Sequence, residues 1–373
     1  MIEISVELGA RRYPIHIGHG LAGKLGDLLA PFRGRRIVVV SSPRIWGLHG
    51  DRIGKPLAAL GAFSRVLIPE GERHKSRATL DALHDAFLGA GLGRDGLVMA
   101  FGGGVVGDVT GFAAATYMRG VDWVQVPTTL LAMVDSSVGG KVGINHPQAK
   151  NLIGAFHQPR AVVADPSLLE TLPARELRSG AYEVLKCGVI GDRALFRALQ
   201  RAPAGFAGWG RVDVENAVAS ACKLKADVVE KDEREDGLRR VLNLGHTMGH
   251  ALEAATAYRR FTHGEAVGWG LIGAAWISTR KGLLAETAFD VIASAVDRVG
   301  PRPRISDIPP ARLLAALRRD KKARAGRVAF ILPTAIGRVV VRQDIAPAEI
   351  RQALRVMAAR EVRLAPPRPP AQN

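Results

Sequence analysis

The sequence predicts a long, basic, globular chain. It has 373 residues, 47% of them hydrophobic, and a formal net charge of +17. This composition argues against a disordered chain, and the length allows two domains with separate cores. No apolar run approaches the roughly 18 residues that span a bilayer, so a membrane protein is not expected. The two cysteines, Cys187 and Cys222, cannot form a disulfide framework and are typical of a reducing, cytoplasmic compartment.

The charge comes from 52 basic and 35 acidic residues. Arginines are scattered through all regions, without a dense basic run carrying interleaved aromatic residues. We therefore expect recognition of a small phosphate- or carboxylate-bearing substrate rather than of nucleic acid. The opening residues carry acids and alternate like a strand, so they do not predict a secretory signal.

Strand and helix signals alternate through the first half of the chain. Short β-branched runs separated by helices are typical of a mostly parallel α/β sheet. We predict a Rossmann-like α/β domain over residues 1–172. Its strands are predicted at 2–8, 36–42, 65–69, 96–101, 122–126 and 161–164, with helices at 76–89 and up to residue 115.

Helical signals dominate after about residue 172. Residues 173–361 are predicted to form a mostly α-helical domain. Its helices are expected at 217–231, 241–257, a buried stretch at 266–277, and 311–319, followed by a strand at 327–332. The proline-rich segment 362–373 is predicted to be disordered.

Two small-residue turns follow predicted strands. Gly102 to Gly107 stands between a strand and a helix, where a backbone can approach a pyrophosphate. The spacing is not the usual dinucleotide fingerprint, so a tight structural turn is an equal alternative. Thr128 and Thr129 follow the strand 122–126, and they either meet a ligand or cap a helix.

A denser motif runs from Asp135 to Asn145. A Gly-Gly turn presenting Lys141 is typical of phosphate binding. The motif lacks Walker A spacing, so ATP hydrolysis is not expected. Lys150 and Asn151 add a second cation and an amide shortly afterwards.

Glu183 and Lys186 are three residues apart on one face of a predicted helix. A surface ion pair is the ordinary interpretation, but their apolar neighbours indicate a buried helix. Lys225 and Arg239 lie on separate elements flanking an acidic turn, so spacing does not show whether they converge.

Three histidines form the sharpest feature. His246 and His250 are four residues apart, which places them on one helical face, and His263 follows in a glycine-bounded turn. Such a set, with a carboxylate such as Glu183, is typical of a divalent-metal site with an open position. Thr247 stands where the zinc-protease motif needs Glu, so that chemistry is excluded.

From residue 13 to residue 337 the chain resembles the 3-dehydroquinate synthases, within the sugar phosphate cyclases. Ordered motifs carry the resemblance. They are Pro69 to Ser76, Gly102 to Asp108, Tyr117 to Gly120, Pro127 to Leu130, Asp135 to Asn145, Lys150 to Gly154, Glu183 to Lys186, Leu242 to His250, and His263 to Glu265.

The resemblance implies a dinucleotide-binding domain over residues 1–172, a metal- and substrate-binding domain over residues 173–361, and a role for each matching position. The metal, zinc or cobalt, would bind Glu183, His246 and His263. NAD would bind Glu72, Lys75, Gly103, Gly104, Thr128, Thr129, Asp135, Lys150, Thr171, Leu172 and Glu176. Substrate would meet Asp108, Lys141, Asn151, Lys186, Lys225, Arg239, Asn243 and His250, with a lysine from 321–322 and with Arg119 of a second subunit of a homodimer.

The resemblance also implies a reaction, that of a lyase in the shikimate pathway of aromatic amino acid biosynthesis. Such enzymes convert 3-deoxy-D-arabino-heptulosonate 7-phosphate to 3-dehydroquinate and phosphate. A hydroxyl is oxidised transiently by NAD with metal assistance, phosphate leaves, the hydride returns, and an aldol step closes the carbocycle.

Three positions depart from the family pattern: Tyr182, Cys187 and Met248. None is an implied ligand. Related cyclases share the scaffold, so an amino-sugar counterpart stays open, as does a metal-dependent polyol dehydrogenase. The Gly139-Gly140-Lys141 turn argues against the dehydrogenase, which needs no phosphate-binding lysines.

Overall fold

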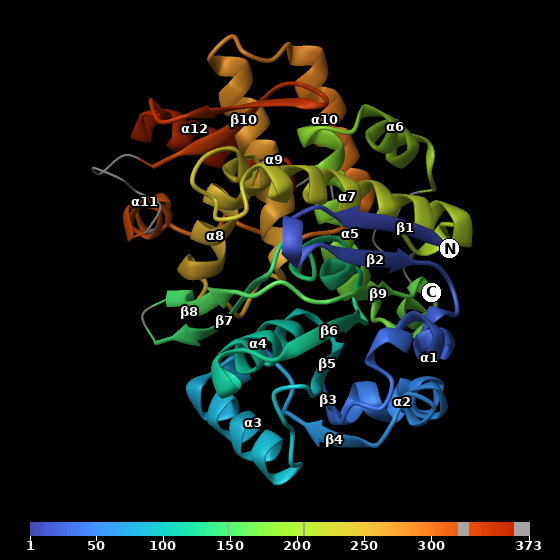
Figure 1. Ribbon diagram of the computed structural model, residues 1–373. Coiled ribbons are helices and arrows are strands. Elements are labelled where there is room, and N and C mark those ends of the chain that lie inside the picture. Colours follow the sequence, from blue (N-terminus) through green and yellow to red (C-terminus); the bar gives the residue numbers. More distant parts are fainter. Residues whose placement is uncertain (148, 204–205, 320–327, 362–373) are drawn as a thin grey trace, which may run out of the picture. The chain divides into compact units, whose positions relative to one another are not determined.

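The computed structural model describes residues 1–147, 149–203, 206–319 and 328–361 (Figure 1). The chain divides into two compact units: Met1–Gly180 with Trp209–Asp236, and Ala181–Gly208 with Gly237–Asn373. Each unit is described by itself. The predicted tail 362–373 and the lysines at 321–322 lie outside the described residues.

This division differs from the predicted single boundary after residue 172. The difference concerns α7 (Arg211–Lys231), a helix predicted for the second domain that belongs to the first unit. It lies along β1 (Ile2–Val6), the N-terminal strand, as Figure 1 shows. Periodicity finds such a helix but does not reveal which core it covers.

A seven-stranded sheet organises the first unit, in the order β1-β2-β9-β6-β5-β3-β4. The β1–β2 pair is antiparallel and the other neighbouring pairs are parallel, which confirms the predicted α/β sheet. The strand order reverses between β3 and β5, the kind of point at which open sheets bind ligands. The remaining strands are β2 (Tyr13–Ile17), β3 (Ile37–Ser41), β4 (Phe63–Leu67), β5 (Leu97–Gly102), β6 (Asp122–Pro127) and β9 (Val162–Ala164).

Both faces of the central part of this sheet are buried because strands such as β3 and β5 are apolar on both sides. In β3, Val38 and Val40 join one core cluster, while Ile37 and Val39 join the other. Successive side chains of a strand point to opposite faces, so a continuous apolar run fills two cores. The first cluster includes α3 (Arg77–Gly89) and α4 (Gly104–Thr116), and the second includes α2 (Pro43–Ala58).

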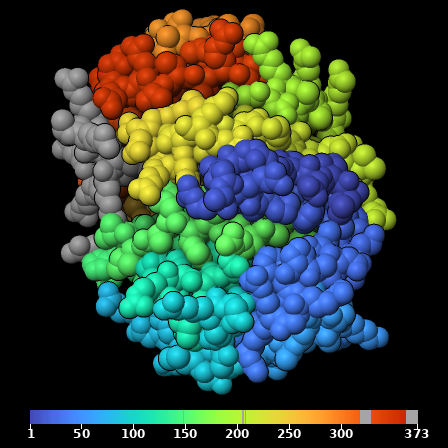
Figure 2. Space-filling model, in the orientation of Figure 1, coloured from blue at the N-terminus to red at the C-terminus, as the bar shows by residue number. Residues whose placement is uncertain are grey.

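Smaller elements complete the first unit. The segment containing β1 and β2 forms a continuous blue band on the face shown in Figure 2. A separate antiparallel hairpin pairs β7 (Lys141–His146) with β8 (Ala149–Phe156). The short helices are η1 (Gly9–Arg11), η2 (Leu21–Lys24), α1 (Leu25–Leu28), η3 (Ala30–Phe32), η4 (Glu72–His74), η5 (Tyr117–Arg119), the π-helical η6 (Ala132–Ser136) and η7 (Pro166–Thr171).

The second unit is mostly helical, as predicted. A two-stranded antiparallel sheet, β10 (Phe330–Ala335) with β11 (Arg338–Arg342), accompanies the helices. Among the described residues, no helix combines the length and the apolar character needed to cross a membrane. The helices are α5 (Ala174–Ile190), whose start belongs to the first unit, α6 (Arg193–Arg201), η8 (Phe206–Gly208), η9 (Leu238–Asn243), α8 (His246–Ala255), α9 (His263–Arg280), α10 (Glu286–Val299), α11 (Pro310–Arg319) and α12 (Pro347–Ala359).

One predicted helix is wrong at its start. The sequence pattern predicted a helix from 241 to 257, but η9 ends at Asn243 and α8 begins only at His246. Gly245, between them, has a left-handed φ of 79°, which breaks a right-handed helix. The break places His246 in the first turn of α8.

Candidate active site

Glycines bring α8 and α9 into close contact. A Cβ on Gly270 would lie 1.8 Å from the carbonyl oxygen of Gly245, and one on Gly249 would lie 3.1 Å from that of Ala266. Neither position therefore accepts a larger residue without movement of the backbone. Backbone-to-backbone packing of this kind fixes the two helices firmly against each other, and with them the side chains of their first turns.

Two of the three histidines stand at the start of a helix. His246 is the first residue of α8, and His263 is the first residue of α9, rather than part of the predicted turn. The α9 start is fixed by a capping box: Glu265 N donates to Thr262 Oγ1 at 3.4 Å, and Thr262 N donates to Glu265 Oε2 at 2.8 Å. Glu265 is thus accounted for by helix capping.

Glu183 of α5 faces both histidines. Its Oε1 lies 3.9 Å from His246 Nε2 and 3.7 Å from His263 Nε2. The residue is 1% exposed, and Oε1 has no hydrogen-bond partner among the described residues. An unsatisfied buried polar group costs about 1–3 kcal/mol, so this arrangement calls for a ligand.

The far nitrogen of each histidine already has an acceptor. His246 Nδ1 lies 3.1 Å from the carbonyl oxygen of Leu244, and His263 Nδ1 lies 3.4 Å from Glu253 Oε2. A neutral imidazole carries one N–H, and these acceptors favour placing it on Nδ1. The two Nε2 atoms, both near Glu183 Oε1, are then free of a proton and able to bind a metal.

These atoms fit a divalent cation. Tetrahedral zinc with nitrogen and oxygen ligands places neighbouring ligand atoms about 3.4 Å apart, close to the 3.7 and 3.9 Å measured here. A cation at this position would give Glu183 Oε1 the partner that it lacks among the described residues.

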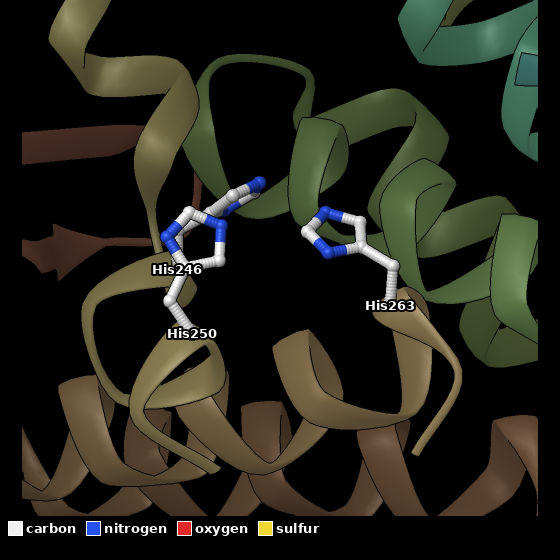
Figure 3. Close-up of side chains that lie close together, drawn as sticks. All are labelled: His246, His250 and His263. Carbon is white, nitrogen blue, oxygen red and sulfur yellow. The ribbon is translucent and has the colours of Figure 1, made fainter. Parts of the chain in front are cut away.

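His250 offers a second possible ligand set. Figure 3 shows His246 and His250 on one helix and His263 across from them. One ligand atom from each of the three lies within 4.8 Å of the others. The geometry therefore allows either Glu183 or His250 to complete the set with His246 and His263.

Lys186 gives the site a buried positive charge. Its Nζ forms an ion pair with Glu183 Oε2, and the two side chains are 2% and 1% exposed. The alternative of a surface ion pair is therefore wrong. Arg239, also buried, and Asn243 lie on η9, the segment that leads directly into His246.

A buried aromatic cluster supports α5 and α9. The Arg302 guanidinium lies 4.3 Å from the Trp269 ring centroid and 5.7 Å from that of Tyr182. Tyr182 Oη donates to the carbonyl oxygen of Gly300 at 2.7 Å. Tyr182, one of the departures from the family pattern, thus fills a structural position beside Glu183.

In the first unit, a polar network surrounds Lys75. This lysine is 4% exposed, and its Nζ donates to Asp108 and to Asn151. Burial raises the pKa of Asp108, although the nearby Lys75 ammonium acts in the opposite direction. Glu72 accepts from Asn145 Nδ2 at 2.8 Å and lies 3.8 Å from Lys150 Nζ.

Two further candidate lysines of this unit also form ion pairs. Lys225 of α7 donates to Asp135 Oδ1 at 2.7 Å, and Lys141 donates to Glu235 Oε2 at 2.5 Å. Glu235 has a left-handed φ of 63°, an uncommon conformation for a non-glycine residue. Lys225 thus meets a residue distant in sequence, a contact that spacing did not predict.

The glycine turn after β5 approaches the segment after β6. A Cβ on Gly103 would lie 3.1 Å from Thr129 Cγ2, and one on Gly104 would lie 3.2 Å from Ser136 Oγ. Thr129 Oγ1 accepts from Ala132 N at 3.1 Å, so the capping alternative is realised there. Thr128 is buried. The glycines thus allow the turn after β5 to pack closely against the segment after β6, at the carboxyl ends of both strands.

Four predicted residues lie apart from these clusters. Arg119 is exposed on a turn where it and Met118 both have left-handed φ values, 68° and 48°. Thr171, at the end of η7, contacts His49 Nε2 through its hydroxyl at 2.8 Å. Leu172 and Glu176 follow at the junction with α5. Their functional roles remain predictions.

Two acids that contact candidate residues, Glu235 and Glu253, were not singled out from the sequence. Glu253 lies seven residues after His246, the spacing of two helical turns, and that periodicity was the available signal. Glu235 carried no such signal, because it lies in an irregular turn.

Comparison with known proteins identifies the family of this chain. A model of the 3-dehydroquinate synthase N-terminal region matches residues 65–179, and one of the C-terminal region matches residues 180–323. A 3-dehydroquinate synthase of Pelotomaculum thermopropionicum is 47% identical over 93% of this chain and 94% of its own length. The chain belongs to the 3-dehydroquinate synthase family. A second such enzyme, from Acidithiobacillus ferrooxidans, is 46% identical over 95% of this chain and 98% of its own.

A solved structure extends the family comparison. The 2-epi-5-epi-valiolone synthase of Streptomyces hygroscopicus, with NAD+ and Zn2+ bound, has a TM-score of 0.84 at 28% identity and covers 96% of this chain and 99% of its own. The sugar phosphate cyclase fold therefore applies to this family member along nearly its whole length.

Proposed function

We propose that the protein is a 3-dehydroquinate synthase, a lyase that converts 3-deoxy-D-arabino-heptulosonate 7-phosphate to 3-dehydroquinate and phosphate. The observation that carries this function, within the family, is the convergence of His246 Nε2 and His263 Nε2 on the buried Glu183 Oε1. In the shikimate pathway this reaction leads to the aromatic amino acids.

The residues present fit NAD and a divalent metal, zinc or cobalt. The unsatisfied Glu183 oxygen fits the metal, and the glycine turn at Gly103 and Gly104 fits a pyrophosphate. NAD+ and Zn2+ in the related valiolone synthase support this pair. When bound, NAD supplies a reversible hydride acceptor and the metal supplies Lewis-acid polarisation of a substrate oxygen.

In the second unit, Glu183, His246 and His263 would hold the metal. Lys186 places a positive charge against the far oxygen of Glu183 and is suited to an anionic substrate group. Arg239, Asn243 and His250 would contact the substrate, because they lie on the segment and helix that carry His246.

In the first unit, Lys141 and Lys225 would bind substrate anions, with Asp108 and Asn151 orienting hydroxyl groups. Each lysine now faces a carboxylate that neutralises it. An incoming phosphate or carboxylate would compete for the same ammonium. The NAD-contacting set would be Glu72, Lys75, Gly103, Gly104, Thr128, Thr129, Asp135, Lys150, Thr171, Leu172 and Glu176.

The protein would act as a cytoplasmic homodimer, without a nucleic-acid or membrane partner. The exposed turn bearing Met118 and Arg119 supports the dimer, because two successive left-handed residues cost about 1–2 kcal/mol each and such strain concentrates at functional sites. Arg119 would then reach the site of the neighbouring subunit. Sedimentation of wild type and Arg119→Ala, with activity of their mixtures, tests this arrangement.

The deciding assay supplies the heptulosonate phosphate with NAD at a concentration far below that of the substrate. Release of many phosphates per NAD, with 3-dehydroquinate as product and without NADH accumulation, is expected. Steady NADH production from a simple polyol would instead identify a dehydrogenase. Turnover of the amino-sugar analogue alone would identify the amino-dehydroquinate counterpart.

A further inference from the structure

Glu253 is a buried acid to which the proposed reaction gives no role. It is 3% exposed and lies on α8. His246, His250 and Glu253 occupy positions i, i+4 and i+7, so they share one face of the helix. Burial of a carboxylate is unfavourable unless it is paired, so the contacts of the Glu253 carboxylate need an explanation.

The Glu253 carboxylate contacts a proposed metal ligand, His263. Its Oε2 lies 3.4 Å from His263 Nδ1, on the side of the ring opposite Nε2. His263 Nε2 in turn lies 3.7 Å from Glu183 Oε1. Glu253 therefore contacts the ring from behind and does not share the proposed metal position.

The two histidines differ in what holds their Nδ1 atoms. His246 faces a neutral carbonyl oxygen, that of Leu244, at 3.1 Å, whereas His263 faces a carboxylate. Side-chain exposure also differs, 10% for His246 against 27% for His263. The more exposed ring thus has the charged acceptor, which holds orientation more strongly than a carbonyl.

We infer that Glu253 is a positioning residue that holds His263 in the Nδ1–H tautomer and sets the metal affinity of the site. A carboxylate behind a ligating imidazole fixes ring rotation and increases the donor strength of the opposite nitrogen. The inference rests on the proposed function, because it assigns a part to a residue behind that metal site.

The test measures metal binding by the purified full-length apoprotein, with no substrate present. Zn2+ affinity is obtained by competition with a chromophoric chelator, and the coordination geometry from the visible absorption of the Co2+ form. Glu253→Ala should weaken Zn2+ binding about 10- to 100-fold. Glu253→Gln should recover part of that loss, because its amide oxygen still accepts from Nδ1 without the negative charge.

Glu286→Gln is the matched control, since Glu286 is exposed on α10 and undergoes the same chemical change. It should bind Zn2+ within about twofold of wild type, a change of only about 0.4 kcal/mol at RT ln 2. A Co2+ spectrum altered in Glu253→Ala and closer to wild type in Glu253→Gln would support the positioning role, since loss of general stability does not produce that order.

Wild-type Zn2+ affinity in both Glu253 variants would overturn the inference while leaving the proposed function intact. If Glu253→Ala does not fold, Glu253→Gln decides alone. If the wild-type apoprotein binds neither Zn2+ nor Co2+, the inference and the metal-dependent function both fail. The wild-type protein and the Glu253 variants therefore distinguish failure of the proposed function from failure of the inference alone.

Discussion

The two compact units treat charge differently around their candidate residues. In the second unit, Lys186 pairs with Glu183 Oε2, while Glu183 Oε1 faces two imidazole nitrogens and has no hydrogen bond among the described residues. In the first unit, Lys75, Lys141 and Lys225 each have a carboxylate partner. The second unit thus keeps one carboxylate oxygen open to a cation, whereas the lysines of the first unit can exchange their carboxylate partners for an incoming anion.

The largest effect is expected from the second unit. Glu183→Ala, His246→Ala and His263→Ala should each lose bound metal and at least about 1,000-fold in turnover, because three protein ligands form a catalytic metal site. His250→Ala should keep the metal and lose turnover. Elemental analysis of desalted protein measures this. Equal metal loss in His250→Ala and His246→Ala would replace Glu183 by His250 as the third ligand.

Lys141→Met tests the charge-paired cluster. Loss of the ammonium removes a proposed phosphate contact together with the Lys141–Glu235 ion pair, so kcat/KM should fall about 100-fold, mainly through KM, while bound metal stays unchanged. Lys223→Met is the matched control, because Lys223 is 60% exposed and pairs with Asp227 on the same helix. Steady-state kinetics with both variants decide. A similar loss in the two would mean that overall charge, rather than Lys141, governs the reaction.

Gly103→Ala tests the glycine turn with a smaller expected effect. The added methyl would lie 3.1 Å from Thr129 Cγ2 and narrow the proposed NAD cradle, so NAD affinity should fall about tenfold. In Gly47→Ala, on an exposed part of α2, the new Cβ has open space, so stability should rise by about 0.5–1 kcal/mol without a change in NAD affinity. Calorimetric titration with NAD distinguishes the two. Unchanged affinity in Gly103→Ala would remove the turn from the cofactor site.

The smallest effect is expected on stability, from loss of an ordinary ion-paired carboxylate of the first unit, Asp122. Partial burial raises the pKa of Asp122, but hydrogen bonds from Arg160 and Arg35 outweigh it and hold the pKa below its ordinary value. A depressed folded-state pKa stabilises the protein above the unfolded-state value, and this contribution disappears as the pH falls through the folded-state value. Asp122→Asn should therefore reduce stability by about 1 kcal/mol at pH 7, and less below about pH 4.

Urea unfolding at several pH values measures the difference between Asp122→Asn and wild type. A difference that stays constant from pH 7 to about pH 3 would show that the carboxylate charge makes no contribution.

Local sequence patterns predicted the parallel sheet and the shared face of His246 and His250, because both depend on short-range periodicity. The same patterns placed the start of α8 too early, since a single left-handed glycine at position 245 outweighed a continuous apolar run. They also placed His263 in a turn, although its capping box was present in the sequence.

Local sequence patterns could not predict contacts between distant segments of the chain. The pairing of Lys225 with Asp135, and the allocation of α7 to the first unit, depend on tertiary packing. The contact of Glu253 with His263 requires α8 and α9 to cross closely at glycines, which the pattern of a single helix does not reveal. The family resemblance, rather than periodicity, favoured Glu183 over His250 as the third metal ligand.

The most direct measurement is anomalous diffraction from crystals of the protein grown with Zn2+, at wavelengths on both sides of the zinc absorption edge. We predict one strong peak from an ion coordinated by Glu183 Oε1, His246 Nε2 and His263 Nε2 at about 2.0–2.2 Å, with Glu253 on the far side of His263. A peak bonded to all three histidines with Glu183 uncoordinated, or no peak among these residues, would contradict it.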